Sequence, residues 1–84
     1  MSEKNPYIIG ENYFIRTVTH HYTGKLTAVF DNELVLIDAA WIPDDGIFMG
    51  AVANGSFNEV ELYPDGVEVI LGRGSILDAC QISW

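Results

Sequence analysis

Residues 33–42, ELVLIDAAWI, decide the fold class of this 84-residue chain. Large apolar and β-branched residues dominate the stretch, which is typical of a β-strand. Successive side chains of a strand point to opposite faces. One regular strand therefore has two apolar faces, with Leu34, Leu36, Ala40 and Ile42 on one and Val35, Ile37, Ala39 and Trp41 on the other. Such a strand needs cover on both faces, from a helix or from another subunit.

The residues before this stretch also predict strand. Residues 13–30 alternate between apolar and polar side chains and are rich in β-branched and aromatic residues. Since this is long for one strand, we expect a bend or turn near residues 20–24, where Gly24 tolerates a tight bend or a bulge. Asp31-Asn32 separates the two apolar runs and indicates a two-residue hairpin turn.

The residues after it begin with a turn at 43–46. A short helix is expected over residues 47–55, capped by Asp44 or Asp45, with Phe48, Met49 and Val52 as a partial apolar stripe. Residues 56–66 are expected to form a surface connection that ends in a Pro-Asp-Gly turn at 64–66. Two strands, residues 67–71 and 75–82, follow on either side of a glycine-containing turn.

These elements predict a mainly β fold: a small, strongly bent, five-stranded antiparallel barrel with one short helix between strands three and four. Residues 13–84 would form this single domain, and residues 1–12 an irregular arm whose Tyr7, Ile8 and Ile9 dock on it.

Composition limits the partners of the chain. Twelve carboxylates against four basic residues give a net charge of −8, which repels phosphate backbones and disfavours DNA and anionic membranes. Cys80 is the only cysteine, so no disulfide forms within the chain, and we expect it to be a buried small hydrophobe. With no apolar run long enough to span a membrane and no signal-peptide pattern, a cytoplasmic location is expected.

Two stretches resemble motifs of the Sm-like family, which includes the Hfq proteins. GKLTAVFDNELVL, residues 24–36, is similar to the first family motif: a glycine, alternating apolar residues, an aromatic-Asp pair, a turn and an apolar strand. ILGRGSIL, residues 70–77, is similar to the second motif, in which Arg-Gly lies in the turn between the last two strands. Val35 stands nearest to where the base-contacting asparagine of the first motif would fall.

The resemblance implies a small β-barrel that forms rings, because edge strands of neighbouring Sm-like subunits pair. The layout of Trp41, Gly46 and the glycine turn also resembles small bacteriophage-encoded proteins. A chain this short buries a limited share of its surface, and oligomerisation is a common way to make up the deficit.

Arg73, between Gly72 and Gly74, is the candidate ligand-binding residue. Flanking glycines allow backbone amides to approach an anion, and the arginine supplies a bidentate donor. The alternative is that Arg73 pairs with a carboxylate of a neighbouring subunit. Arg16 and Lys25 are expected to be ion-pair partners.

The other polar groups carry no clear chemistry. His20 and His21 are adjacent on a strand, so their side chains point to opposite faces and cannot chelate one metal. Asp44-Asp45 fits a turn and helix cap better than a cation site. Because no nucleophile–base pattern, phosphate-binding loop or metal-ligand cluster is present, we expect no enzyme activity, no metal and no cofactor.

Two functions follow from these observations. The first is a non-enzymatic protein that assembles with copies of itself into a ring, a tube or a filament. Its expected interface residues are Val35, Ile37, Trp41, Phe48 and Trp84. The second is an oligomer that binds a nucleotide or short RNA at the Arg73 turn, including a phage protein that sequesters a host signal nucleotide.

Overall fold

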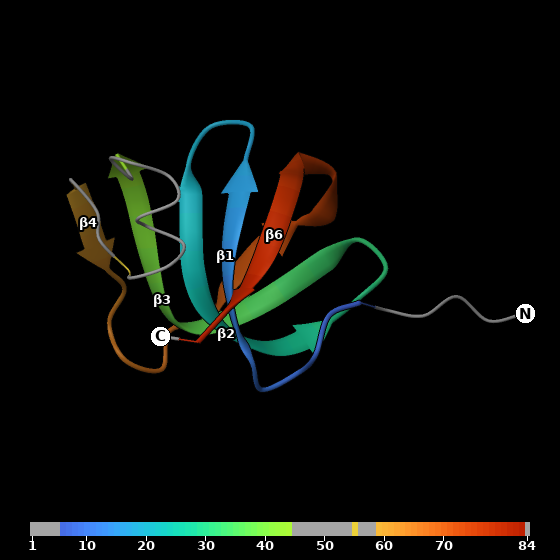
Figure 1. The fold of residues 1–84 in the computed structure, drawn as a ribbon. Helices are drawn as coiled ribbons and strands as arrows, with labels where there is room; N and C mark the ends of the chain where they lie inside the picture. Colours follow the sequence, from blue (N-terminus) through green and yellow to red (C-terminus); the bar gives the residue numbers. More distant parts are fainter. Residues whose placement is uncertain (1–5, 45–54, 56–58, 84) are drawn as a thin grey trace, which may run out of the picture.

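The computed structural model describes residues 6–44, 55 and 59–83. Over these ranges the chain is mainly β, with antiparallel strands in one sheet (Figure 1). The strands are β1 (Asn12–Thr17), β2 (His21–Val29), β3 (Glu33–Asp44), β4 (Glu59–Leu62), β5 (Val69–Gly72) and β6 (Ile76–Ile82). A short 3₁₀ turn, η1 (Arg73–Ser75), joins β5 to β6.

The sheet has the order β4-β3-β2-β1-β6, with β5 attached beside β3. Figure 1 shows these five strands side by side, with the lower ends of β2 and β3 curling away to one side. The two halves of β3 have different outer neighbours. Residues 33–36 pair with β5, and residues 40–44 pair with β4.

The turns predicted at residues 31–32 and 64–66 are confirmed, and the bend expected near residues 20–24 lies slightly earlier in the chain. The turn expected at 43–46 is wrong for Pro43 and Asp44, which belong to β3, and its last two residues lie outside the described ranges. The strand expected over residues 13–30 breaks at residues 18–20, where the Thr17 amide donates to the His20 carbonyl at 2.9 Å. The Asp31-Asn32 hairpin is closed by the Phe30 amide, which donates to the Glu33 carbonyl at 2.8 Å. In the turn at 64–66, Gly66 has a positive φ of 78°, which glycine adopts readily, and the Val67 amide donates to the Pro64 carbonyl at 3.2 Å.

A β-bulge at Asp38 corrects the predicted faces of β3. Asp38 has a φ of 48°, and the pairing with β2 shifts there, from Lys25↔Ile37 to Thr23↔Ala40. One extra residue moves every later side chain to the opposite face. Leu34 and Leu36 therefore share their face with Ala39, and not with Ala40 and Ile42 as expected for a regular strand.

Gly24 lies opposite this bulge and permits it. A Cβ atom at Gly24 would lie 3.0 Å from the Leu36 Cβ, 3.2 Å from the Ala39 Cβ and 3.2 Å from the Ile37 carbonyl oxygen. No larger residue fits without movement of β3, so the predicted role of Gly24 at a bend or bulge is confirmed.

The main core lies on the face of the sheet that carries Leu34 and Leu36. It consists of Tyr13, Ile15, Leu26, Leu34, Leu36, Ala39, Val69 and Leu71. The opposite face also carries buried residues, among them Phe14, Ala40, Ile42 and Ile82. The prediction that β3 is buried on both faces is therefore confirmed for most of its residues. Cys80, expected to be buried, is half-buried on β6.

Two parts of the fold prediction are wrong. The barrel is not closed: within the described ranges β5 pairs with β3 and β6 pairs with β1, and no ladder joins β5 to β6. Among the residues that the structure describes, the sheet has six strands rather than five, because Glu59–Leu62, within the expected surface connection, pairs with β3 as β4. The helix predicted over residues 47–55 lies outside the described residues, except for Gly55.

No helix within the described ranges has the length and apolar character of a membrane span.

Candidate functional site at the last turn and the strand edges

The Arg73 turn is built by the short connection between β5 and β6. η1 holds three residues, and the Ser75 hydroxyl donates to the Gly72 carbonyl at 2.7 Å, which closes the turn from within. β5 then runs along β3 and β6 runs along β1. The turn therefore connects two strands that pair with different neighbours and not with each other within the described ranges.

Arg73 joins this turn to the β2–β3 hairpin. Its backbone amide donates to the Asn32 carbonyl at 2.9 Å, and its Nη1 donates to the Phe30 carbonyl at 2.9 Å. Two loops that the sequence places far apart thus meet at one arginine. Neither expected role of Arg73 predicted this contact with backbone carbonyls inside its own chain. The guanidinium has further N–H donors that these two bonds do not use.

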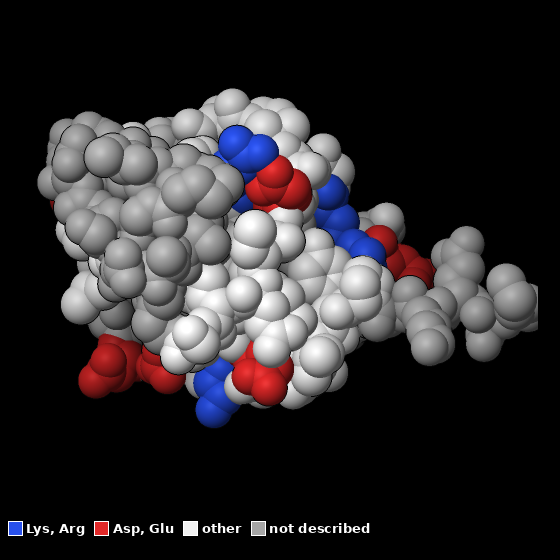
Figure 2. Space-filling model, in the orientation of Figure 1, with Lys and Arg blue, Asp and Glu red and all other residues white. Residues whose placement is uncertain are grey.

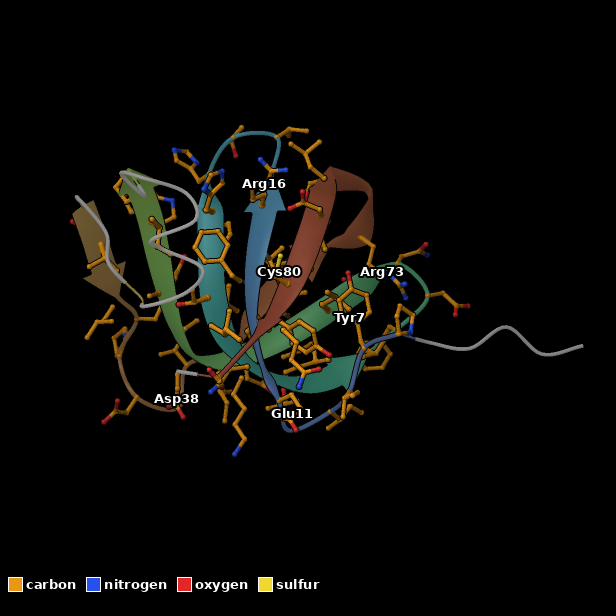
Figure 3. All side chains as sticks on the ribbon, viewed as in Figure 1. Tyr7, Glu11, Arg16, Asp38, Arg73 and Cys80 are labelled. Carbon is orange, nitrogen blue, oxygen red and sulfur yellow. The ribbon has the colours of Figure 1, made fainter. Side chains whose placement is uncertain are left out.

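An aromatic ring from the N-terminal arm completes the site. The Arg73 guanidinium carbon lies 5.5 Å from the centroid of the Tyr7 ring, within the range of a cation–π interaction (Figure 3). Tyr7 also meets Tyr13 edge to face at 5.5 Å, and the Ile8 amide donates to the Tyr13 hydroxyl at 2.8 Å. Tyr7 docks on the body as expected, whereas Ile8 and Ile9 remain exposed.

The two glycines of the turn are not required by its backbone or by its surroundings. Gly72 has a φ of −70°, which any residue adopts, and Gly74 is not among the glycines with positive φ. A Cβ atom at either position would meet nothing within 4 Å. The backbone of the turn is therefore open to approach from outside the chain.

The charges on the face shown in Figure 2 do not form a basic patch. The blue side chains lie apart from one another, each with acidic side chains nearby, and the surface between them is uncharged. Arg16 illustrates this as a confirmed ion-pair partner: its Nε donates to Asp78 Oδ1 at 2.7 Å, and its second nitrogen contacts Oδ2. This hydrogen bond, with the positive charge of Arg16, lowers the pKa of Asp78.

The strand edges are the second candidate surface. β5 and β6 each have one ladder partner among the described residues, so each has one free edge. Ile70 on β5 is 61% exposed and Leu77 on β6 is 63% exposed. β4 also has one ladder partner in the described ranges, and its Leu62 is 81% exposed. Backbone groups at a free edge can pair with another chain.

The predicted interface residues do not share one surface. Val35 is 7% exposed, and Ile37 is half-buried on the same face. Because of the Asp38 bulge, Trp41 lies on the opposite face. The centroid of its ring is 4.9 Å from that of the His20 ring. Trp41 also lines a cavity of about 230 Å³ together with Leu62, Tyr63 and Pro64. Phe48 and Trp84 lie outside the described residues.

Sequence reasoning missed Ile70 and Leu77. Ile70 pairs with Val35 across β3 and β5, so it lies directly beside a predicted interface residue but at the sheet edge. Leu77 lies between Ile76 and Asp78, where the register of β1 and β6 shifts. The only available signal was that both residues lie in apolar runs next to the last turn.

The two histidines have different aromatic partners. The His20 ring contacts Trp41, and the His21 ring lies 5.8 Å from Phe14. In the described ranges no group of three or more histidine, cysteine or acidic side chains is placed to hold a metal ion. Asp45 and the side chain of Asp44 lie outside the described part of the chain.

Comparison of the chain with family models, with curated proteins and with solved structures finds no match. The resemblances to Sm-like and phage-encoded proteins therefore stay predictions, and the proposals below depend on the residues themselves.

Proposed function

We propose that this protein is a non-enzymatic structural protein that assembles with copies of itself by pairing of strand edges. The observation that carries the proposal is the edge of β5 that has no ladder partner among the described residues. The sequence of this strand, VILG, contains no charged residue and no proline, and Ile70 is exposed on it. Natural proteins usually protect a free edge with charges, proline or bulges, because an unprotected edge pairs with other chains.

The free edge of β6 is the partner that we propose for β5. The β6 sequence, ILDACQI, holds one charged residue, Asp78, which is engaged by Arg16 of the same subunit. Leu77 adds an exposed apolar side chain. A β5–β6 contact joins two different surfaces and is therefore heterologous. Copies joined in this way form a ring if the rotation between neighbours closes, and a filament if it does not.

The experiment that tests assembly is light scattering of the native protein and of Ile70→Lys. We expect the native protein to have a mass that is a multiple of 9.3 kDa, and Ile70→Lys to shift it towards the monomer. Val18→Lys is the control, because Val18 is also exposed but lies in the β1–β2 turn. Two results would contradict the proposal: a native protein that is a monomer, or a native oligomer whose mass is unchanged in both Ile70→Lys and Val18→Lys.

Binding of a nucleotide or short RNA at the Arg73 turn is the second candidate function. Four features support it: the contact between the Arg73 and Asn32 loops, the nearby Tyr7 ring, the unused guanidinium donors and the open backbone at Gly74. Aromatic rings and arginine planes are common platforms for unpaired bases. The net charge of −8 opposes binding of a long polyanion, so a short ligand fits better.

Absorbance at 260 nm after gentle purification tests this second function. Excess absorbance that Arg73→Ala removes and Arg16→Ala retains would support it, with the mass in solution unchanged in both variants. If the native protein carries no nucleotide and binds none of the common nucleotides in equilibrium dialysis, this function is wrong and the assembly proposal is unaffected.

A further inference from the structure

The largest cavity described lies at the bulge of β3, away from the Arg73 turn. It has a volume of about 400 Å³ and is lined by Gly10, Asn12, Thr23, Gly24, Lys25, Asp38 and Ile82. Ligand pockets commonly hold 300–1,000 Å³. Most of the lining side chains here are polar or charged, which indicates a small polar ligand rather than an apolar one.

The bulge is what brings opposite charges into this cavity. Ile37 and Lys25 are cross-strand partners and therefore share one face of the sheet. In a regular strand, Asp38 follows Ile37 and would point to the opposite face, away from Lys25. Asp38, with its left-handed backbone, instead lines the same cavity as Lys25. Non-glycine residues held in this conformation are uncommon, and they concentrate at functional sites.

The two charges are available to a ligand. Within the part of the chain that the structure describes, neither Lys25 nor Asp38 has an ion pair or a side-chain hydrogen bond, and so the prediction that Lys25 is an ion-pair partner finds no contact there. Arg16, by contrast, is engaged by Asp78. An ammonium and a carboxylate that face one cavity without contacting each other are complementary to a molecule that carries the opposite pair.

We propose that this cavity binds a small zwitterion of the α-amino acid class. Lys25 would hold the carboxylate of the ligand and Asp38 its ammonium group, each through charge-assisted hydrogen bonds. At Gly10 the space where a Cβ atom would lie is open, and the buried Thr23 also lines the cavity. The site goes beyond self-assembly, and its occupancy does not depend on the proposed β5–β6 contact.

The test is a titration of the ¹⁵N-labelled protein with glycine and L-serine, followed by amide NMR shifts. We expect saturable shifts at Gly24, Lys25 and Asp38 in the millimolar range. Serine amide, which lacks the carboxylate, and N-acetylserine, which lacks the ammonium, should each bind at least about tenfold more weakly, because each loses one charged contact.

Variants separate the site from non-specific effects. Asp38→Asn removes the charge but keeps a residue that tolerates the left-handed backbone, and Lys25→Gln removes the other charge at an exposed position. Both should weaken glycine binding at least about tenfold. Glu33→Gln, an exposed carboxylate of β3 outside the cavity, should leave it unchanged. Absence of saturable shifts with both amino acids, equal binding of N-acetylserine, or undiminished binding by Asp38→Asn would overturn the proposal.

Discussion

The strands β4 and β5 both flank β3, yet their free edges differ. β4 has the sequence EVEL, in which two glutamates alternate with apolar residues. β5 has the sequence VILG, without a charge. Charged residues on an edge strand discourage pairing with other chains. The second half of β3 is therefore bordered by the charged strand β4, and the first half by the uncharged strand β5. Of the two, the uncharged edge of β5 is the one that favours pairing with another chain.

The bulge at Asp38 separates these two halves. Before it, Val35 and Ile37 face away from the main core, and after it Ala40 and Ile42 do so. The half beside β5 carries Leu34 and Leu36, both fully buried in the main core. The unprotected edge thus borders the best-packed part of the sheet, so an assembly contact there would build on a rigid element.

The largest expected loss of stability comes from truncating a core side chain of β3 that lies beside β5. Leu36→Ala should lower the free energy of unfolding by about 2–5 kcal/mol, because it leaves a cavity at a fully buried site. The matched change Leu62→Ala on β4, at an 81% exposed side chain, should cost less than about 0.5 kcal/mol. Urea denaturation at matched protein concentration measures both, and similar losses would contradict the packing described.

A smaller loss is expected where the two halves of β3 meet β2. Gly24→Ala should destabilise the protein by about 1–3 kcal/mol, because the added Cβ presses on Leu36, Ala39 and the Ile37 carbonyl. Gly72→Ala is the control, since its φ is ordinary and its Cβ would meet nothing. The control should be neutral or stabilising by up to about 1 kcal/mol. Thermal unfolding distinguishes the two, and a tolerated Gly24→Ala would argue against the close contact.

The bulge itself can be tested at Asp38. Asp38→Val should destabilise by at least about 1 kcal/mol, because a β-branched residue is strongly disfavoured at positive φ. Asp38→Gly should lie within about 0.5 kcal/mol of the native protein, since glycine adopts this conformation readily. If chemical denaturation gives equal stability for valine and glycine, Asp38 is not held in the left-handed conformation.

The smallest effect is expected at the Arg16–Asp78 pair. The pair is exposed, so Asp78→Asn should cost at most about 1 kcal/mol at neutral pH. Arg16 lowers the pKa of folded Asp78, so the stabilisation is present above the unfolded carboxyl pKa of about 3.9 and is lost as the pH falls through the lower folded value. The urea midpoints of both proteins should therefore draw together as the pH falls below about 4, and should coincide once the pH is below the folded pKa of Asp78. A constant difference at all pH values would contradict this.

The sequence predicted the strands and turns that depend on local signals. Alternation, the Asp31-Asn32 pair and the Pro-Asp-Gly turn each act over a few residues, and each was found as expected. β4 was missed because four residues with alternating glutamates also fit a solvated loop. The open barrel could not be predicted, since it depends on which distant strands β5 and β6 choose as partners.

The candidate sites were predicted less well, for a related reason. Nothing in the local sequence shows that Asp38 adds a residue to β3, and this one residue moved Trp41 away from Val35 and Ile37. Arg73 was expected to bind an anion or a carboxylate of a neighbouring subunit, whereas the acceptors found for it are the backbone carbonyl of Phe30 and, through its own amide, that of Asn32. Contacts between loops distant in sequence leave no periodic signal.

Hydrogen exchange at β5 and β6 tests edge pairing most directly. The measurement compares exchange rates of those amides of β5 and β6 that do not bond to β3 or β1, at high and low protein concentration. Pairing between copies predicts slow exchange at high concentration that speeds up on dilution, while the amides of β2 stay protected throughout. Fast exchange of the edge amides at every concentration would contradict self-assembly through these strands.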